Sequence, residues 1–378
     1  MELLNSGKME SGNIGTLIQT RHSSKPGDLK QKAERIRWFN WEYWSGKAFY
    51  FPMYVWGPLL ALRSGHPAFF TTANPGIYTG GFGFESKYDT ILKIPEQYRP
   101  KTTFAKETDD FLTVLEKISQ AGIEFPLIAK PDLGFRGFLV KKIDSANELQ
   151  AYLEKYKTDF IIQEFVWRAG EFGVLYHRFS GESKGKITSV TLKEFLSVTG
   201  DGRSSVLELV AQNPRALLQL ERLQDTHAHL LPTVPAAGEQ VSLGVIGNHS
   251  KGTRFISGNH LIDNELEATF DKIADQIRGF NYGRFDIKCD SWDELKQGKN
   301  MTILEINGVC SEPTHIYDPE KMTYPGALLE ILKHWMLIEK IARANRRLGA
   351  AYVPTFKMIR IIREGLKKVK RLQQLANP

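Results

Sequence analysis

Cysteine is scarce in this sequence of 378 residues, which contains only Cys289 and Cys310. Two cysteines cannot form the disulfide framework of a small secreted domain, and neither lies in a C-x-x-C motif or a Cys/His cluster typical of zinc. We therefore expect a protein of a reducing cytoplasm.

The sequence also lacks an uninterrupted apolar run of membrane-spanning length. Residues 48–62 are mostly apolar, but the run is shorter than the roughly 20 residues that a spanning helix needs, and Pro52 and Pro58 interrupt it. We expect it to be buried or interfacial. Residues 1–30 are polar and rich in Gly and Ser, without the apolar core of a secretory signal, and are expected to form a mobile leader.

Charge is ordinary in amount but uneven in distribution. The chain has 42% hydrophobic and 25% charged residues, as in a globular protein of two or three lobes, and a formal net charge of +7. Much of the surplus lies in an amphipathic stretch, 355–372: Lys357, Arg360, Arg363, Lys367, Lys368, Lys370 and Arg371. Such a stretch suits an anionic membrane on the inner, cytoplasmic face, or a helix packed on its own domain. Nucleic acid is disfavoured, since no basic motif interleaved with aromatics is present.

Hydrophobic periodicity predicts a mixture of helices and strands without strict alternation, which indicates the α+β class. Helices are expected at 108–120, 145–156, 206–224 with a break at Pro214, 266–279, 327–347 and 355–372. Strands are expected at 125–130, 137–140, 160–165, 172–179, 186–191, 283–289 and 301–306.

Two strand-like segments carry the first candidate site. Asp286 lies in one, and Glu305 and Asn307 lie in the other, two positions apart and so on the same face of a strand. Two carboxylates and an amide oxygen are hard ligands suited to Mg²⁺ rather than zinc. Alternatively, these are exposed polar positions of ordinary strands.

A lysine at a strand end begins the second candidate site. Lys130 precedes a loop that contains Gly134, Arg136 and Gly137, where a cation and exposed backbone N–H groups could hold phosphate. The loop lacks the G-x-x-x-x-G-K-[ST] pattern of a P-loop, and two glycines between strands also suit a plain hairpin turn.

A third candidate site follows the strand at 160–165. An acid here, Glu164 or Glu171, could accept from an adenine amine or from ribose hydroxyls, and backbone groups of the connecting segment at Val166 and Trp167 could read the adenine edge. Either glutamate could equally be a solvent-facing acid at a strand end.

The order of these residues resembles the ATP-grasp superfamily, in particular the D-alanine:D-alanine ligases and, from Val198 onward, the cyanophycin synthetase and glutathione synthetase group. The resemblance is carried by Lys87, Lys130, Glu164, Glu171, Asp286, Glu305 and Asn307, and by the phrases at 85–87, 99–102, 128–131, 170–172, 198–203 and 304–308. It spans about residues 87–319. The chain departs from the ligases at Phe135 and Arg136, where serines are common, and at 308–313, where a Pro-Gly turn is usual.

The resemblance implies an ATP-grasp fold, in which two α+β lobes clamp ATP. It places Lys87 and Lys130 on phosphates, Glu171 on the ribose and Glu164 to Trp167 at the adenine. Asp286, Glu305 and Asn307 would hold Mg²⁺, usually two ions. Arg284 matches an arginine that stabilises a tetrahedral intermediate, and Lys193 and Arg203 match basic positions that face phosphate or substrate.

The expected domains are a leader at 1–30, a short aromatic-rich N-terminal region at 31–86, an ATP-grasp domain at 87–325 and basic C-terminal helices at 326–378. The region at 31–86 could face substrate or membrane, with Asn74, Gly80, Gly81 and Ser86 as candidates on loops.

The expected activity is ATP- and Mg²⁺-dependent joining of a carboxylate to an amine through an acyl phosphate, with an amino acid or a lipid-like acid as substrate. A small-molecule kinase on the same fold and a nucleotide-binding regulatory protein without turnover remain alternatives.

Overall fold

A computed structural model describes residues 26–134 and 137–376, which form two compact units. The smaller unit contains residues 26–40 and 197–243, and the larger contains 41–196 and 244–376. Most of the expected leader, residues 1–25, lies outside the described residues, and 26–30 belong to helix α1, Pro26–Phe39. The domain boundaries expected from the sequence remain predictions.

The smaller unit pairs a two-stranded sheet with short helices. Strands β7 (Ser197–Thr199) and β8 (Gln240–Ser242) are antiparallel, and the helices besides α1 are α7 (Val206–Gln212), α8 (Pro214–Leu217) and α9 (Leu220–Thr226). The expected helix at 206–224 is broken at Pro214, as predicted. Pro214 takes the first position of α8, where its missing N–H costs nothing, and Asn213 caps that helix.

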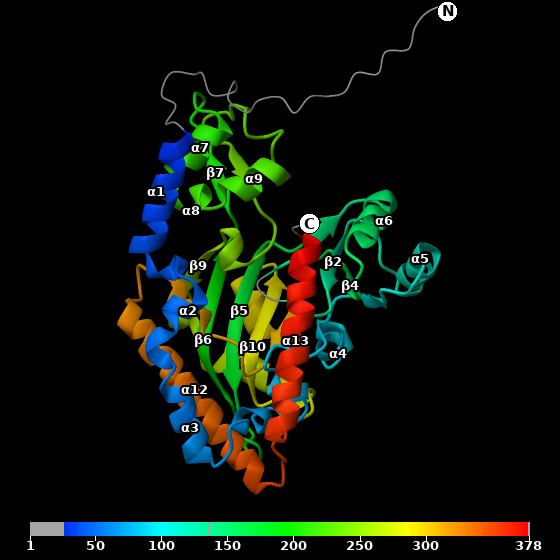
Figure 1. Cartoon of the computed structure of the whole chain (residues 1–378), viewed down its shortest axis with the longest axis vertical. Coiled ribbons are helices and arrows are strands. Elements are labelled where there is room, and N and C mark those ends of the chain that lie inside the picture. Colours follow the sequence, from blue (N-terminus) through cyan, green and yellow to red (C-terminus); the bar gives the residue numbers. More distant parts are fainter. Residues whose placement is uncertain (1–25, 135–136, 377–378) are drawn as a thin grey trace, which may run out of the picture. The chain divides into compact units, whose positions relative to one another are not determined.

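A five-stranded antiparallel sheet is the centre of the larger unit (Figure 1). Its order is β11 (Met301–Asn307), β10 (Tyr282–Cys289), β5 (Gly170–His177), β6 (Lys186–Glu194) and β9 (Arg254–Ser257). Helix α10 (Asn264–Asp275) buries Phe270 and Ile273 against sheet residues such as Phe285. Helix α10 thus covers one face of the sheet, and polar side chains lie on the opposite face.

A second antiparallel sheet of this unit has four strands. Its order is β1 (Thr102–Ala105), β4 (Phe160–Glu164), β2 (Leu127–Pro131) and β3 (Lys141–Ile143), and α5 (Phe111–Gln120) and α6 (Ala146–Lys155) pack on it. The expected strand at 137–140 was wrong. Gly137 and Leu139 have φ of 69° and 52°, so the chain turns there and becomes extended only at Lys141.

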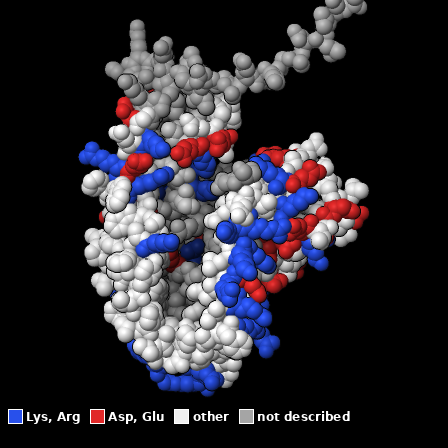
Figure 2. Space-filling model, viewed as in Figure 1, with Lys and Arg blue, Asp and Glu red and all other residues white. Residues whose placement is uncertain are grey.

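Long helices complete the larger unit. They are α12 (Tyr324–Arg347) and α13 (Thr355–Ala376), with shorter α2 (Gly46–Phe49), α3 (Trp56–Ser64), α4 (Lys87–Ile91) and α11 (Trp292–Gln297). Single 3-10 turns occur at Trp41–Tyr43, Phe51–Met53, Phe69–Thr72, Tyr78–Gly80, Glu96–Tyr98, His249–Lys251, Asn259–Leu261 and Thr314–Tyr317. Figure 2 shows Lys and Arg side chains gathered along α13. Helices together with antiparallel sheets confirm the α+β class.

The apolar run at 48–62 is divided between core and surface. Phe49, Met53 and Leu60 are buried, whereas Leu59 and Leu62 are exposed. Within the described residues, every helix is too short or too polar to span a bilayer.

Candidate functional site

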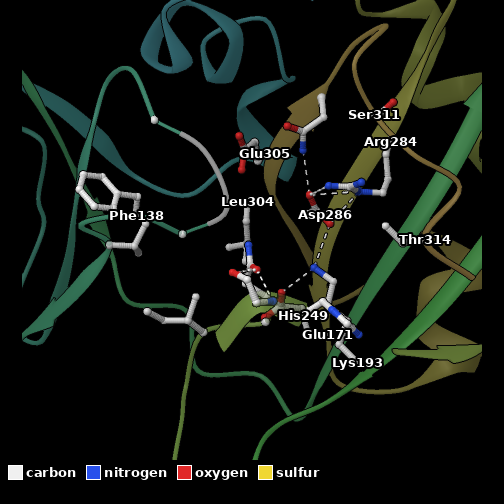
Figure 3. A pocket seen from close by; sticks show the side chains of 18 of the residues that line it. Phe138, Glu171, Lys193, His249, Arg284, Asp286, Leu304, Glu305, Ser311 and Thr314 are labelled. Carbon is white, nitrogen blue, oxygen red and sulfur yellow. Dashed lines mark hydrogen bonds and ion pairs between the residues drawn. The ribbon is translucent and has the colours of Figure 1, made fainter. Parts of the chain in front are cut away.

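A cavity of about 560 Å³ lies in the larger unit and collects charged side chains from both of its sheets. Figure 3 shows those of the five-stranded sheet, with Glu171, Lys193, Arg284, Asp286 and Glu305 labelled. The five-stranded sheet contributes Glu171, Lys193, Arg284, Asp286, Lys288, Glu305 and Asn307. The four-stranded sheet contributes Lys130, Gln163 and Glu164, and α4 contributes Lys87. Acidic and basic side chains thus lie together on the lining of one cavity, which can contact a ligand through charges of both signs.

Strand register explains why these residues meet. Asp286 pairs with Glu305 across β10 and β11, and Glu171 of β5 pairs with both Lys193 of β6 and Lys288 of β10. Because side chains of a strand alternate between faces, directly paired residues point to the same side. Four strands thus bring five charged groups to one surface.

Asp286 is the centre of the charged network. Its carboxylate accepts from Arg284 Nη2 at 3.0 Å, from Lys193 Nζ at 2.9 Å and from Asn307 Nδ2 at 2.9 Å (Figure 3). Burial alone would raise the pKa of Asp286, but Arg284 and Lys193 outweigh it and hold that pKa well below its usual range. Asp286 is therefore ionised at any physiological pH.

Lys193 joins two carboxylates. Its Nζ donates to Glu171 Oε1 at 2.8 Å and to Asp286 Oδ1 at 2.9 Å, and only 5% of its side chain is exposed. Burial lowers the pKa of Lys193, but Asp286 and Glu171 raise it more, so the net shift is upward. This lysine stays charged and fixes both acids in place.

A second ion pair joins Lys87 to Glu305. Ser86 caps α4 by accepting from Asp89 N, which sets the helical turn that carries Lys87. Burial works against both charges, yet the pairing raises the pKa of Lys87 and lowers that of Glu305. Glu305 is thus a second ionised acid beside Asp286.

Lys130 has a different environment. It is 8% exposed, and its Nζ donates to the neutral Gln163 Oε1 at 3.2 Å. Burial lowers the pKa of Lys130 to about 8, although Glu305 partly opposes the change. A buried lysine hydrogen-bonded to a neutral amide gains most from an anionic ligand.

The candidate metal ligands are all oxygen donors. Asp286 and Glu305 are ionised oxygen donors on paired positions, which suits a hard divalent cation. The described part of the chain holds no group of three or more His, Cys, Asp or Glu side chains placed to bind a metal. Asp286 and Glu305 supply only two such side chains, with the Asn307 amide as a third oxygen donor. Their role as Mg²⁺ ligands stays a prediction.

Most of the sequence-predicted residues meet in this cavity. Those that line it are Lys87, Lys130, Gly134, Gly137, Glu164, Val166, Glu171, Lys193, Arg284, Asp286, Glu305 and Asn307. Trp167 is 71% exposed and is absent from the described lining. Arg203 belongs to the smaller unit, and Arg136 lies outside the described residues. The individual roles remain predictions.

Several lining residues were missed in the sequence. They are Trp41, Trp44 and Phe49 of the aromatic block, the loop 245–250, and residues 310–312 with Thr314 and Tyr317. In this loop a Cβ on Gly247 would lie 1.9 Å from Glu171 Oε1, so glycine lets the loop approach Glu171 without displacing that side chain.

The expected loop candidates before Lys87 have another role. Asn74 is fully buried, accepts from Asn281 N and Tyr282 N at 2.8 Å and donates to Gly80 O at 2.9 Å. Asn74, Gly80, Gly81 and Ser86 are not among the described residues that line the cavity. Asn74 holds the loop at 74–80 against the start of β10.

Comparison with known proteins found no matching family model and no matching curated protein. Solved structures similar to this chain include the VanG D-Ala:D-Ser ligase of Enterococcus faecalis, with 14% identity and a TM-score of 0.39 over 68% of this chain and 64% of that one. D-alanine--D-alanine ligase of Bacillus anthracis matches with 14% identity and a TM-score of 0.40, over 70% and 71%. A bifunctional glutathione synthetase of Pasteurella multocida matches with 15% identity and a TM-score of 0.34, over 68% and 38%.

These are proteins of the groups that the sequence motifs resemble. The chain spans 64% of the first of them and 38% of the third. At TM-scores below 0.5 the similarity decides neither fold family nor activity, so the chemistry has to come from the cavity itself.

Proposed function

We propose that this protein is an ATP- and Mg²⁺-dependent ligase that joins a carboxylic acid to an amine through an acyl phosphate. The observation that carries the proposal is the joint placement of Lys87, Lys130, Lys193 and Arg284 with Asp286 and Glu305 in one cavity. A polyphosphate needs cations, its metal needs carboxylates, and both sets line one cavity.

The basic side chains would bind and orient the phosphates. Lys130, which has no carboxylate as its hydrogen-bond partner in the described structure, would donate to a phosphate oxygen. Lys87, which is ion-paired with Glu305 at the cavity, would lie beside the phosphate. Both offset negative charge as a phosphoryl group transfers.

Asp286, Glu305 and Asn307 would hold Mg²⁺, which when bound would supply positive charge to the phosphate oxygens. Arg284, fixed by Asp286 and by the backbone oxygen of Glu312, would orient the acid and stabilise an oxyanion. Its pKa is raised further because the pairing with Asp286 outweighs its burial, so it stays a cation.

In the proposed reaction a carboxylate oxygen of the acid bonds to the γ-phosphorus as the bond to the ADP oxygen breaks. The amine nitrogen then bonds to the acyl carbon, phosphate leaves with the electron pair of the C–O bond, and the nitrogen loses a proton. The products are an amide, ADP and phosphate.

The test measures ADP and phosphate release with Mg²⁺, ATP and pooled acids and amines. Turnover that requires both an acid and an amine and is lost in Glu305→Ala is the expected result. A phosphorylated product formed without an amine would identify a kinase instead, and ATP binding without turnover would indicate a regulatory protein.

A further inference from the structure

A second cavity, of about 1240 Å³, adjoins the candidate site within the larger unit. Its walls come from α2, α3 and α12, with Phe69, Phe70 and Phe82 from the segments between them. The volume exceeds the roughly 300–1,000 Å³ of most small-molecule pockets. This cavity can therefore hold a sizeable group.

The walls of the second cavity are mainly apolar. Leu60, Phe69 and Ile338 are buried side chains of its wall, and Lys47 and Glu312 are the only Asp, Glu, Lys or Arg side chains among its described lining residues. A polar ligand would lose hydrogen bonds to water here without replacing them, whereas an apolar one gains from burial.

The two cavities share part of their lining. Gly46, Tyr50, Cys310, Ser311 and Glu312 line both. Cys310 is fixed through its backbone N–H, which donates to Gly81 O at 3.1 Å, and it follows β11 by three residues. The two cavities thus meet at these residues.

The junction carries one acidic side chain, Glu312, whereas the cations that could bind an acid lie in the first cavity. The Cys310 side chain at the junction is an exposed thiol. Glu312 has both oxygens occupied, since Tyr50 O–H donates to one and Tyr317 O–H to the other. In the first cavity, Lys87 and Arg284, each paired with an acid of the network, are the cations that a carboxylate would meet and that would repel an ammonium group.

We propose that the acid activated at this site is a medium- to long-chain apolar carboxylic acid, whose chain occupies the second cavity while its carboxylate lies beside Arg284. The assignment of the carboxylate rests on the proposed ligase function, whereas occupation of the cavity is a matter of binding alone. Each methylene that enters the cavity should tighten binding about fourfold.

Binding is measured first, by calorimetric titration of the whole protein with butyrate, hexanoate, octanoate, decanoate and decylamine. Affinity that rises with chain length, with decanoate bound and decylamine not, supports the proposal. Affinity independent of chain length, or binding of decylamine in place of decanoate, overturns it.

Variants of α3 locate the chain. Ala61→Phe places a ring in the cavity, and Leu62→Glu places a carboxylate on a wall position that is 79% exposed and so tolerates change. Leu59→Phe is the matched control, because Leu59 lies on the same helix, is 51% exposed and is not among the described lining residues. Decanoate affinity should fall at least tenfold in the first two and stay unchanged in the third, with ATP binding and melting temperature as checks on folding. Unchanged affinity in both lining variants overturns the proposal.

Hydroxylamine in place of the amine separates the two proposals, because it traps an acyl phosphate as a hydroxamate. Hydroxamate from decanoate in preference to butyrate supports both. Hydroxamate from short acids without chain-length preference keeps the ligase and overturns the apolar substrate. If decanoate binds as expected but no acid gives hydroxamate, the ligase fails and the cavity remains a site for an apolar acid.

Discussion

Asp286 accepts hydrogen bonds from two cations that are themselves largely buried. Removal of its carboxylate in Asp286→Ala leaves Arg284 without its salt-bridge partner and Lys193 with Glu171 alone. The free energy of unfolding, measured by urea denaturation at pH 7, should fall by about 3–5 kcal/mol. Asp290→Ala is the control, since Asp290 is 44% exposed and pairs with Arg168 at the surface. Asp290→Ala should lower the free energy of unfolding by less than about 1 kcal/mol. Equal losses in the two variants would contradict the buried network.

Lys130 predicts a pH dependence of nucleotide binding. Burial lowers its pKa to about 8, so in the free protein its charge is present at pH 7 and is lost as the pH rises through 8. Affinity for ATP should therefore fall above pH 8, by up to about tenfold per pH unit. Titrations from pH 7 to 9.5 would measure this change. The Lys130→Arg variant keeps its charge over this range, so its affinity for ATP should not change with pH. An equal fall in affinity in both proteins would show that another group causes the pH dependence.

Helix α13 carries the basic surplus and has two kinds of surface. Met358, Ile361 and Leu372 are buried, and a Cβ on Gly365 would lie 2.0 Å from the Phe84 ring, so this face packs against the larger unit. Three further apolar side chains of α13, Phe356, Ile359 and Leu366, are exposed. Both alternatives raised by the sequence, a packed helix and a membrane-facing one, are thus compatible with one helix.

The prediction of an anionic membrane partner is tested on that exposed face. Ile359→Gln with Leu366→Gln removes apolar area without disturbing the packed face, which deletion of the helix would expose. Co-sedimentation with vesicles rich in phosphatidylserine should decrease in this variant and at higher salt. Leu112→Gln on α5, where Leu112 is 71% exposed, should behave as the wild type. Equal sedimentation of all three proteins would exclude α13 as the contact.

At the scale of the whole molecule, the candidate site is built from elements far apart in the chain, all of them in the larger unit. Ligand binding there should stabilise the folded state by mass action, by about 2.7 kcal/mol at a ligand concentration of 100 times the Kd. A thermal scan with Mg²⁺ and ATP should raise the melting temperature of the wild type and leave that of Glu305→Ala nearly unchanged. Hydrogen exchange should slow in β2, β10 and β11. Slowing confined to the smaller unit would place the nucleotide elsewhere.

Local patterns in the sequence determined the elements and the faces of their side chains. Glu305 and Asn307 share a face because strand side chains alternate, and the break at Pro214 follows from a missing N–H. Such rules act over a few residues. The prediction of a strand at 137–140 was wrong for an equally local reason. An apolar run does not reveal that Leu139 has a positive φ.

Only the tertiary structure decided which faces meet. Lys193 reaches both Glu171 and Asp286 because β6, β5 and β10 pair in one register, and hydrophobic periodicity within each strand carries no information on that pairing. The apolar cavity likewise needs α3, α12 and the segment after β11 packed together. Periodicity determines the direction of a side chain, but long-range packing determines its neighbours, and the chemistry of a site depends on neighbours.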